Sequence, residues 1–159
     1  MKIALGSDHR GAEAVGALVE HLKEAGHEPV ILGLCTGEPC DYPDNAYLVG
    51  RAVSAGQADL GILVCGSGIG MSMAANKIPG IRAALACDEL AAEMSRRHND
   101  ANVLCLAGDR LSSGRACAIA DAFLSATFEG GRHARRVNKM TAIERGENPA
   151  EVKESAAKG

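Results

Sequence analysis

Short apolar runs alternate with longer amphipathic stretches along most of this 159-residue chain. Short continuous apolar runs are typical of buried strands, whereas apolar residues at helical spacing are typical of helices that cover a sheet. Val15, Leu18 and Leu22 recur at helical spacing, and Gly26 follows where that helix would end. The pattern predicts strands at 2–7, 28–34, 60–65, 82–87 and 103–107, and helices at 11–25, 44–55, 71–77, 89–97 and 115–126.

Strands that alternate with helices predict an α/β fold with right-handed crossovers. We expect a Rossmann-like three-layer sandwich around a five-stranded parallel sheet, with all five strands buried on both faces. Ligands in such folds bind at the carboxyl ends of the strands. A basic helical stretch lies within 129–147, and we expect one domain over residues 1–147 followed by a flexible polar tail over 148–159.

Composition narrows the possible partners. The net charge is −3 and aromatic residues make up 3% of the chain, which argues against nucleic acid and anionic membranes as partners. The apolar run at the N-terminus is too short for a signal peptide or a membrane span. None of the six cysteines forms a C-x-x-C pair, so we expect a reduced, cytoplasmic protein.

The first and third predicted strands end in polar and glycine-rich loops. Asp8 follows the first strand, where it either caps the next helix or faces a ligand. The third strand ends at Cys65, and glycines at 66, 68 and 70 then allow successive backbone N–H groups to form an anion-binding nest. A thiol at this place is favoured as a thiolate by the helix dipole, although a small apolar strand residue is the plainer interpretation.

Three common uses of a glycine-rich loop do not fit these residues. A Walker A loop needs Lys after its last glycine and a C-x5-R phosphatase needs Arg at the same place, but Gly70 is followed by Met71. A nicotinamide site would need the glycines after the first strand and an acidic residue after the second. What remains is a cradle that stabilises an enediolate, with the Cys65 thiolate as the base.

Two further segments carry candidate chemistry. His98 lies at the end of the fourth predicted helix, just before the fifth strand. A histidine there is stabilised by the helix dipole, which alone could explain it. The alternative is that His98 lies at the same edge of the sheet as Cys65 and acts with it. Arg132 and Arg136 are four residues apart, so they could clamp a phosphate, although a charged helix face is usually only solvated. No histidine has metal-ligand spacing with a cysteine or carboxylate, so we expect no metal and no cofactor.

Together these motifs resemble the type B ribose-5-phosphate isomerases and the related galactose-6-phosphate isomerase subunits. The resemblance runs in order over about residues 2–145, through segments 6–9, 41–43, 65–70, 74–77, 80–83, 98–103 and 129–133. It implies a homodimer, or a tetramer of paired dimers, with active sites shared between subunits and a C-terminal helix that extends to the partner. One branch of the family uses a carboxylate at the position of Met71, which leaves the cysteine mechanism for this chain.

The resemblance also implies a role for each site residue. Cys65 would be the base, Ser67 would help the substrate oxygens exchange protons, and His98 would open the sugar ring. The remaining residues would bind substrate. They are Gly66, Gly68, Ile69 and Gly70 at the enediolate, Asp8, His9, Tyr42 and Asn99 along the sugar, Arg110 with a looser match, and Arg132, His133 and Arg136 from the partner subunit at the phosphate.

The expected reaction is therefore the interconversion of ribose 5-phosphate and ribulose 5-phosphate. Galactose 6-phosphate and allose 6-phosphate stay open as substrates, because a longer sugar needs only a deeper pocket. This chain carries Cys65, His98 and both arginines itself, which favours a self-sufficient ribose enzyme. A non-catalytic module that binds sugar phosphates is the alternative from another functional class.

Overall fold

A five-stranded parallel sheet forms the centre of the protein, in the strand order β2-β1-β3-β5-β4. The computed structural model describes residues 1–35 and 38–152. The predicted Rossmann-like α/β fold is confirmed, and four of the five strands have the predicted bounds. The strands are β1 (Lys2–Ser7), β2 (Glu28–Leu34), β3 (Leu60–Cys65), β4 (Ala83–Leu85) and β5 (Val103–Ala107).

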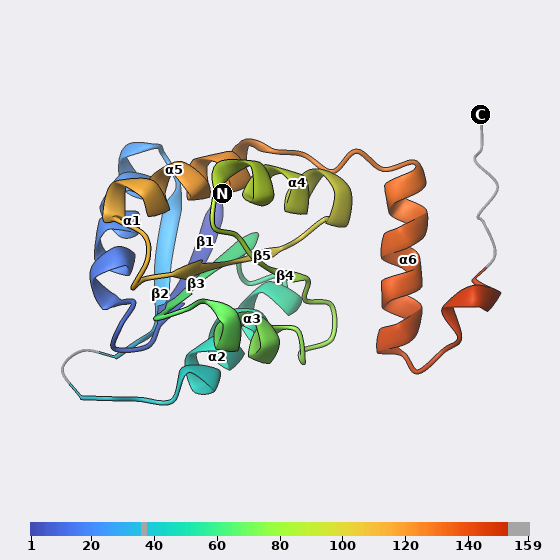
Figure 1. Ribbon diagram of the computed structural model, residues 1–159, viewed down its shortest axis with the longest axis horizontal. Helices are drawn as coiled ribbons and strands as arrows, with labels where there is room; N and C mark the ends of the chain where they lie inside the picture. The colour runs from blue at the N-terminus through green and yellow to red at the C-terminus, as the bar shows by residue number, and fades with distance from the viewer. Residues whose placement is uncertain (36–37, 153–159) are drawn as a thin grey trace.

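Helices cover the two faces of the sheet and complete three layers (Figure 1). One apolar cluster joins one face of the sheet to α1, α4 and α5, and a second joins the other face to α2 and α3. A sixth helix and a short 3-10 turn follow these layers. The helices are α1 (Ala12–Glu24), α2 (Tyr42–Ser54), α3 (Ile69–Ala75), α4 (Glu89–Asn99), α5 (Ser113–Ser125) and α6 (Arg132–Glu144), and the turn is η1 (Pro149–Glu151).

Only the inner strands are buried on both faces. Every residue of β3 and β5 is buried, whereas Ile31 and Leu34 of β2 are 44% and 38% exposed. The expectation that all five strands are fully buried is therefore wrong for β2 and β4. Both are edge strands, each with a neighbouring strand on one side only, and the helices do not fully cover them.

The helix bounds depart from the predicted ones by a few residues. Helix α2 begins at Tyr42 because Pro43 suits the first turn of a helix. Helix α3 begins at Ile69, directly after Gly68, whose positive φ turns the chain out of β3. Strand β4 shrinks to three residues, and the Asn76 side chain bonds both backbone groups of Ala83 at its start.

The expectation that all cysteines are reduced is wrong for one pair. Cys35 directly follows β2 and Cys40 lies just before α2, and the two form a disulfide with Cα atoms 6.3 Å apart. The buried Asn45 amide donates to Cys35 Sγ at 3.1 Å and to the Ser7 carbonyl at 2.7 Å. The other four cysteines are free thiols, and no helix in the described ranges is long and apolar enough to cross a membrane.

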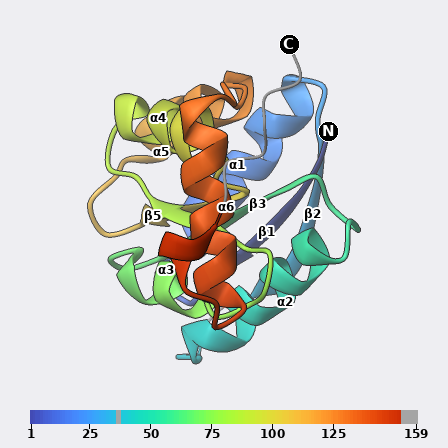
Figure 2. The same cartoon turned by 90° about the vertical axis from the view of Figure 1, so that its right-hand side faces the viewer.

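Helix α6 stands beside the layers rather than within them. Figure 1 shows it upright to the right of the layers, at the end of the sheet where the strands begin, and Figure 2 shows it in front of both helical layers. It packs on the end of α4 and on η1, and Lys139 Nζ donates to the Pro149 carbonyl at 2.7 Å. The predicted tail thus begins with an ordered turn, while 153–159 lie outside the described residues and the boundary at 147 stays a prediction.

Candidate active site

The loop after β3 turns sharply back toward the sulfur of Cys65. Gly68 has φ +74°, and a Cβ there would lie 2.4 Å from Leu85 Cδ1 and 3.0 Å from the Leu106 carbonyl, so only glycine fits. In this conformation the Gly68 N–H donates to Cys65 Sγ at 3.1 Å. The structure therefore places the predicted thiol and a backbone donor of the predicted nest in direct contact.

Side chains from two neighbouring segments pack against this loop on either side. A Cβ at Gly70 would lie 2.6 Å from Tyr42 Cζ, so the phenol ring rests against the loop on one side. A Cβ at Gly66 would lie 2.7 Å from Asp109 Oδ2, on the side where Asp109 pairs with Arg10. Ser67 lies exposed between these two segments, with Oγ accepting from the Ile69 N–H at 3.3 Å.

Two buried cysteines of neighbouring strands differ in their surroundings. Cys105 lies inside β5 with no exposed surface, and this burial, with a smaller effect of nearby Cys65, raises the pKa of the Cys105 thiol. Cys65 ends its strand beside the Gly68 N–H. Cys105 is therefore a protonated core residue, and Cys65 is the thiol that faces the loop.

Asp8 holds the turn that precedes α1, but the N-cap of this helix is Gly11, so the predicted capping role of Asp8 is wrong. Its Oδ1 accepts from the Arg10 N–H at 2.9 Å and from the Gly11 N–H at 3.2 Å. Asp8 is 6% exposed, and both of these hydrogen bonds use Oδ1. One carboxylate oxygen thus holds the loop while the other is left for a ligand, so holding the turn and binding a ligand are compatible. His9 is exposed next to it.

The exits of β1 and β5 are joined by an ion pair that sequence reasoning missed. Arg10 Nε donates to both carboxylate oxygens of Asp109 at 2.9 and 2.8 Å, and Nη2 lies 2.6 Å from Oδ2. Each residue follows the end of a strand in the sequence, but their pairing depends on the fold, which brings the ends of β1 and β5 to the same edge of the sheet. The exposed Arg110 lies at the same edge, where its N–H donates to the Ala107 carbonyl at 3.1 Å.

His98 does not lie at this edge, so the prediction that it shares an edge with Cys65 within one chain is wrong. Helix α4 returns the chain to where the strands begin, and His98 and Asn99 occupy its last turn. Val103 then starts β5 beside Gly61, whereas Cys65 pairs with Ala107. The four residue steps between these levels correspond to about 13 Å of strand.

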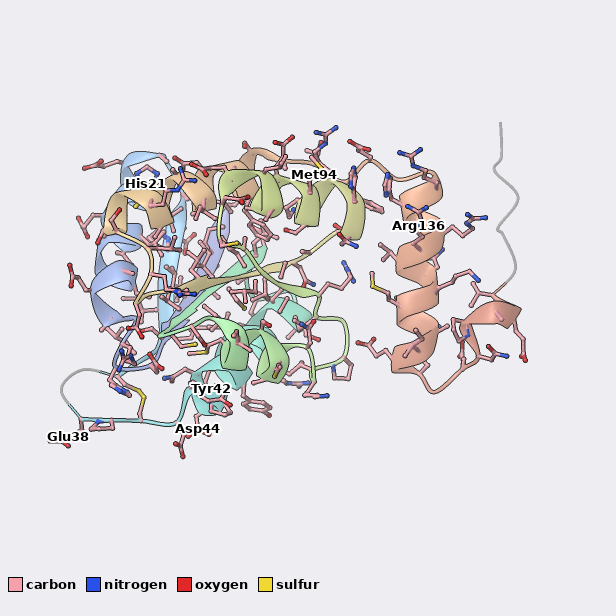
Figure 3. The ribbon with its side chains drawn as sticks, viewed as in Figure 1. His21, Glu38, Tyr42, Asp44, Met94 and Arg136 are labelled. Atoms are coloured by element: carbon pink, nitrogen blue, oxygen red, sulfur yellow. A yellow bond between two sulfur atoms is a disulfide. The ribbon has the colours of Figure 1, made fainter. Side chains whose placement is uncertain are left out.

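Helix α6 brings its basic residues to His98 and not to Cys65. The His98 and His133 rings stack with centroids 4.1 Å apart, and Glu129 Oε2 lies 3.7 Å from Nε2 of each. Arg132 Nε donates to His133 Nε2 at 3.3 Å. Figure 3 shows Arg136 on α6, well away from Tyr42, which lies below the sheet at the start of α2.

The predicted site residues therefore form two separate groups in one chain. We call one group the carboxyl-edge half-site: Asp8, His9, Tyr42, Cys65, Gly66, Ser67, Gly68, Ile69, Gly70 and Arg110. We call the other the amino-edge half-site: His98, Asn99, Arg132, His133 and Arg136.

Charge and burial shape the amino-edge half-site. Burial lowers the pKa of His133, and the neighbouring His98 and Arg132 lower it further. Hydrogen bonding to Arg97 holds the pKa of Glu129 below its usual value. His98, Glu129 and His133 also form a group that could hold a metal ion. The expectation that no histidine has metal-ligand spacing with a carboxylate is therefore wrong for Glu129 and His133, which are four residues apart. His98 joins them only through the fold.

Two grooves on the surface of the described residues lie away from Cys65. A groove of about 510 Å³ lies between α2 and α3, and its lining includes Pro43, Tyr47 and Ile78. A second groove of about 390 Å³ separates α6 from the segment around Ile81. The carboxyl-edge half-site thus lies outside both grooves in the single chain.

Comparisons with known proteins add an independent finding. Residues 3–140 match the family model described as Ribose/Galactose Isomerase. The chain is 46% identical to the ribose-5-phosphate isomerase B of Escherichia coli over 147 residues, which is 92% of this chain and 99% of that protein. It is 44% identical to the probable ribose-5-phosphate isomerase B of Mycoplasma pneumoniae over 144 residues, 90% of this chain and 95% of that one.

Solved structures agree with these relatives. The Clostridium thermocellum ribose-5-phosphate isomerase B superposes with a TM-score of 0.90 at 46% identity, covering 92% of this chain and 99% of that one. The Mycoplasma genitalium ribose-5-phosphate isomerase B, solved with bound ribulose 5-phosphate, gives a TM-score of 0.86 at 43% identity, covering 91% and 96%. Sequence and fold therefore point to the same group of proteins.

Proposed function

Since this chain belongs to the ribose/galactose isomerase family and is an isomerase, we propose that it interconverts ribose 5-phosphate and ribulose 5-phosphate, with Cys65 as the base. The observation that carries the proposal is the Gly68 N–H directed at Cys65 Sγ from 3.1 Å. This donor supports a negatively charged sulfur at the entrance of a glycine loop. The bound ribulose 5-phosphate of the Mycoplasma genitalium relative supports the same substrate pair.

The proposed reaction starts with opening of the sugar ring. His98 gives a proton to the ring oxygen as the bond from C1 to that oxygen breaks. The C1 hydroxyl releases its proton to solvent water as the aldehyde forms, and His98 takes a proton back from the same water. A histidine suits this step because imidazole gains and loses protons near neutral pH.

Proton transfer between C1 and C2 follows. The Cys65 thiolate takes the proton from C2, the electron pair of that bond forms the C1–C2 double bond, and the carbonyl pair moves to O1. Backbone N–H groups of the loop at 66–70 stabilise this enediolate, which is typically worth about 3–4 kcal/mol per donor. Ser67 Oγ passes a proton between O2 and O1, and Cys65 returns its proton to C1 to give the ketose.

The two half-sites imply that the working site needs two chains. Catalytic groups act from about 3–3.5 Å, yet Cys65 and His98 lie at opposite edges of one sheet. In a two-fold dimer, α6 and the end of α4 from one subunit would face the carboxyl-edge half-site of the other. Arg132 and Arg136 would then bind the substrate phosphate across the interface.

A coupled assay tests the proposal directly. Purified protein is offered ribose 5-phosphate, galactose 6-phosphate and allose 6-phosphate, and we expect turnover of the first. Cys65→Ala should reduce kcat by about 10²–10⁴, as is usual for loss of a general base. In deuterated water the wild type should place deuterium on C1 of the ketose. Full activity of Cys65→Ala would refute this base, and binding of sugar phosphate without turnover would favour a non-catalytic module.

We place the reaction in the cytoplasm as part of the same proposal. A phosphorylated sugar carries charge that a bilayer excludes, so the substrate stays in the compartment that makes it. The Cys35–Cys40 disulfide gives the test, because such bonds are rare in reducing compartments. A reducing compartment should keep Cys35 and Cys40 as thiols, and the bond should form once the purified protein meets air. Protein alkylated at cell lysis should therefore carry both thiols, and a disulfide present at that moment would contradict this location.

A further inference from the structure

Glu129 joins two histidines at the amino-edge half-site. Its Oε2 lies 3.7 Å from Nε2 of His98 and of His133, and one ligand atom from each of the three residues lies within 4.8 Å of the others. Across 1–35 and 38–152, no second group of three such side chains comes this close together. We propose that His98, Glu129 and His133 bind a divalent transition-metal ion of the zinc type, which the isomerase reaction does not require.

The donor set suits such an ion. Two imidazoles and one carboxylate are common ligands of zinc, with a fourth position left for water. Bond lengths of about 2.0–2.2 Å in a tetrahedron place ligand atoms about 3.3 Å apart. The two separations of 3.7 Å at Glu129 exceed this by little, so side-chain rotation is enough to close them.

The carboxylate is held so that one oxygen remains for the ion. Arg97 donates to Glu129 Oε1 through Nε at 2.6 Å and also through Nη2, and the Glu129 N–H donates to the Arg97 carbonyl at 3.0 Å. Oε2 is thereby directed at the histidines. Metal-binding carboxylates are usually held by a hydrogen bond of this kind, which fixes their orientation.

Two features must rearrange when the ion binds. The histidine rings are parallel within 2°, and an ion lies in the plane of each ring that binds it, so one ring must turn. The His98 side chain is 35% exposed and has room, whereas that of His133 is 7% exposed. Arg132 donates to His133 Nε2 and must swing away, and its positive charge opposes the ion. Arg132 is therefore expected to limit the affinity.

Metal binding should also affect catalysis. This consequence rests on the proposed isomerase function, whereas the metal site itself does not. An ion on His98 Nε2 takes the lone pair that proton transfer to and from the sugar ring would use. It also occupies the place where Arg132 and His133 would meet the phosphate. The ion should therefore inhibit the isomerase in competition with the sugar phosphate, and a chelator should reverse the inhibition.

The full-length protein is first treated with a chelator to remove bound metal. Its titration with zinc chloride in a calorimeter then tests the site. We expect one ion per chain, affinity about tenfold or more weaker in Glu129→Gln, and tighter binding in Arg132→Gln. His21→Gln is the matched control. His21 Nε2 lies 2.8 Å from Asp121 Oδ1, and this pair is remote from the metal site, so the substitution should leave zinc affinity unchanged. Cobalt should bind without a sulfur charge-transfer band, and equally well to Cys65→Ser.

The proposed site would be overturned if Glu129→Gln bound zinc as tightly as the wild type. It would also be overturned if the cobalt-loaded protein showed a sulfur charge-transfer band that disappears in Cys65→Ser. Thermal unfolding checks that each variant is folded, and His133→Asn replaces Glu129→Gln if the latter is not. Zinc binding without any isomerase activity would contradict the proposed function and leave the metal site standing. Turnover that a bound ion leaves unchanged would contradict the inhibition alone.

Discussion

Mixing two inactive variants would test whether one active site is built from two chains. Cys65→Ala removes the base from the carboxyl-edge half-site, and His98→Asn removes the proton donor from the amino-edge half-site. The two residues are separated by about 13 Å of strand within one chain, so they cannot reach the same sugar carbon from that chain. Each variant alone should be inactive, since every site of its dimer lacks one group.

The expected recovery follows from the symmetry of a two-fold dimer. Unfolding an equal mixture and refolding it gives mixed dimers in about half of the molecules, and each mixed dimer has one intact site and one doubly defective site. About a quarter of the wild-type activity per chain should therefore return in the coupled assay. Size-exclusion chromatography at the assay concentration confirms that dimers form.

A second mixture serves as the control. Cys65→Ala refolded with Asp8→Asn should recover nothing, because both changes lie in the carboxyl-edge half-site and leave every site of a mixed dimer damaged. If the Cys65→Ala and His98→Asn mixture is no more active than its parts, the two-chain site is refuted. His98 would then act within its own chain after a rearrangement, or would not act at all.

Two further predictions follow from the loops of the carboxyl-edge half-site. Gly70→Ala places a methyl group 2.6 Å from the Tyr42 ring, so it should lower the free energy of unfolding by about 1–3 kcal/mol and raise KM. Gly16→Ala is the control, because no atom lies within 4 Å of its added methyl group, and it should raise the free energy of unfolding by about 0.5–1 kcal/mol. Urea unfolding measures both changes in stability. Reducing the Cys35–Cys40 bond should cost about 2 kcal/mol by release of its short loop. A reductant should leave the urea midpoint of Cys40→Ser unchanged, and a shift there would assign the effect to another part of the chain.

The sequence predicted the sheet well because its strands differ clearly from its helices in periodicity. Lys2–Ser7, Leu60–Cys65 and Val103–Ala107 were predicted with their observed bounds. The failure came with strand position in the sheet. Val30 and Ile31 are as apolar as the residues of β3, but β2 lies at an edge, and an apolar run does not reveal how many neighbours its strand has.

The site was predictable residue by residue but not in its arrangement. The residues around Cys65 predicted a reactive loop, because a glycine-rich anion-binding nest can be identified from consecutive residues in the sequence. His98 was misplaced because its position depends on the direction in which α4 crosses the sheet. Glu129 and Arg10 were missed because each depends on a partner far away in sequence, Arg97 and Asp109 respectively.

Helix α6 makes assembly measurable without any substrate. Most of its contacts are with the end of α4 and the η1 turn, and Ile143 on its surface is 60% exposed. Such a helix should open easily in an isolated chain, so its backbone amides would exchange with deuterium early, while those of β3 stay protected. Protection of α6 that grows with protein concentration would then report subunit association in the same experiment.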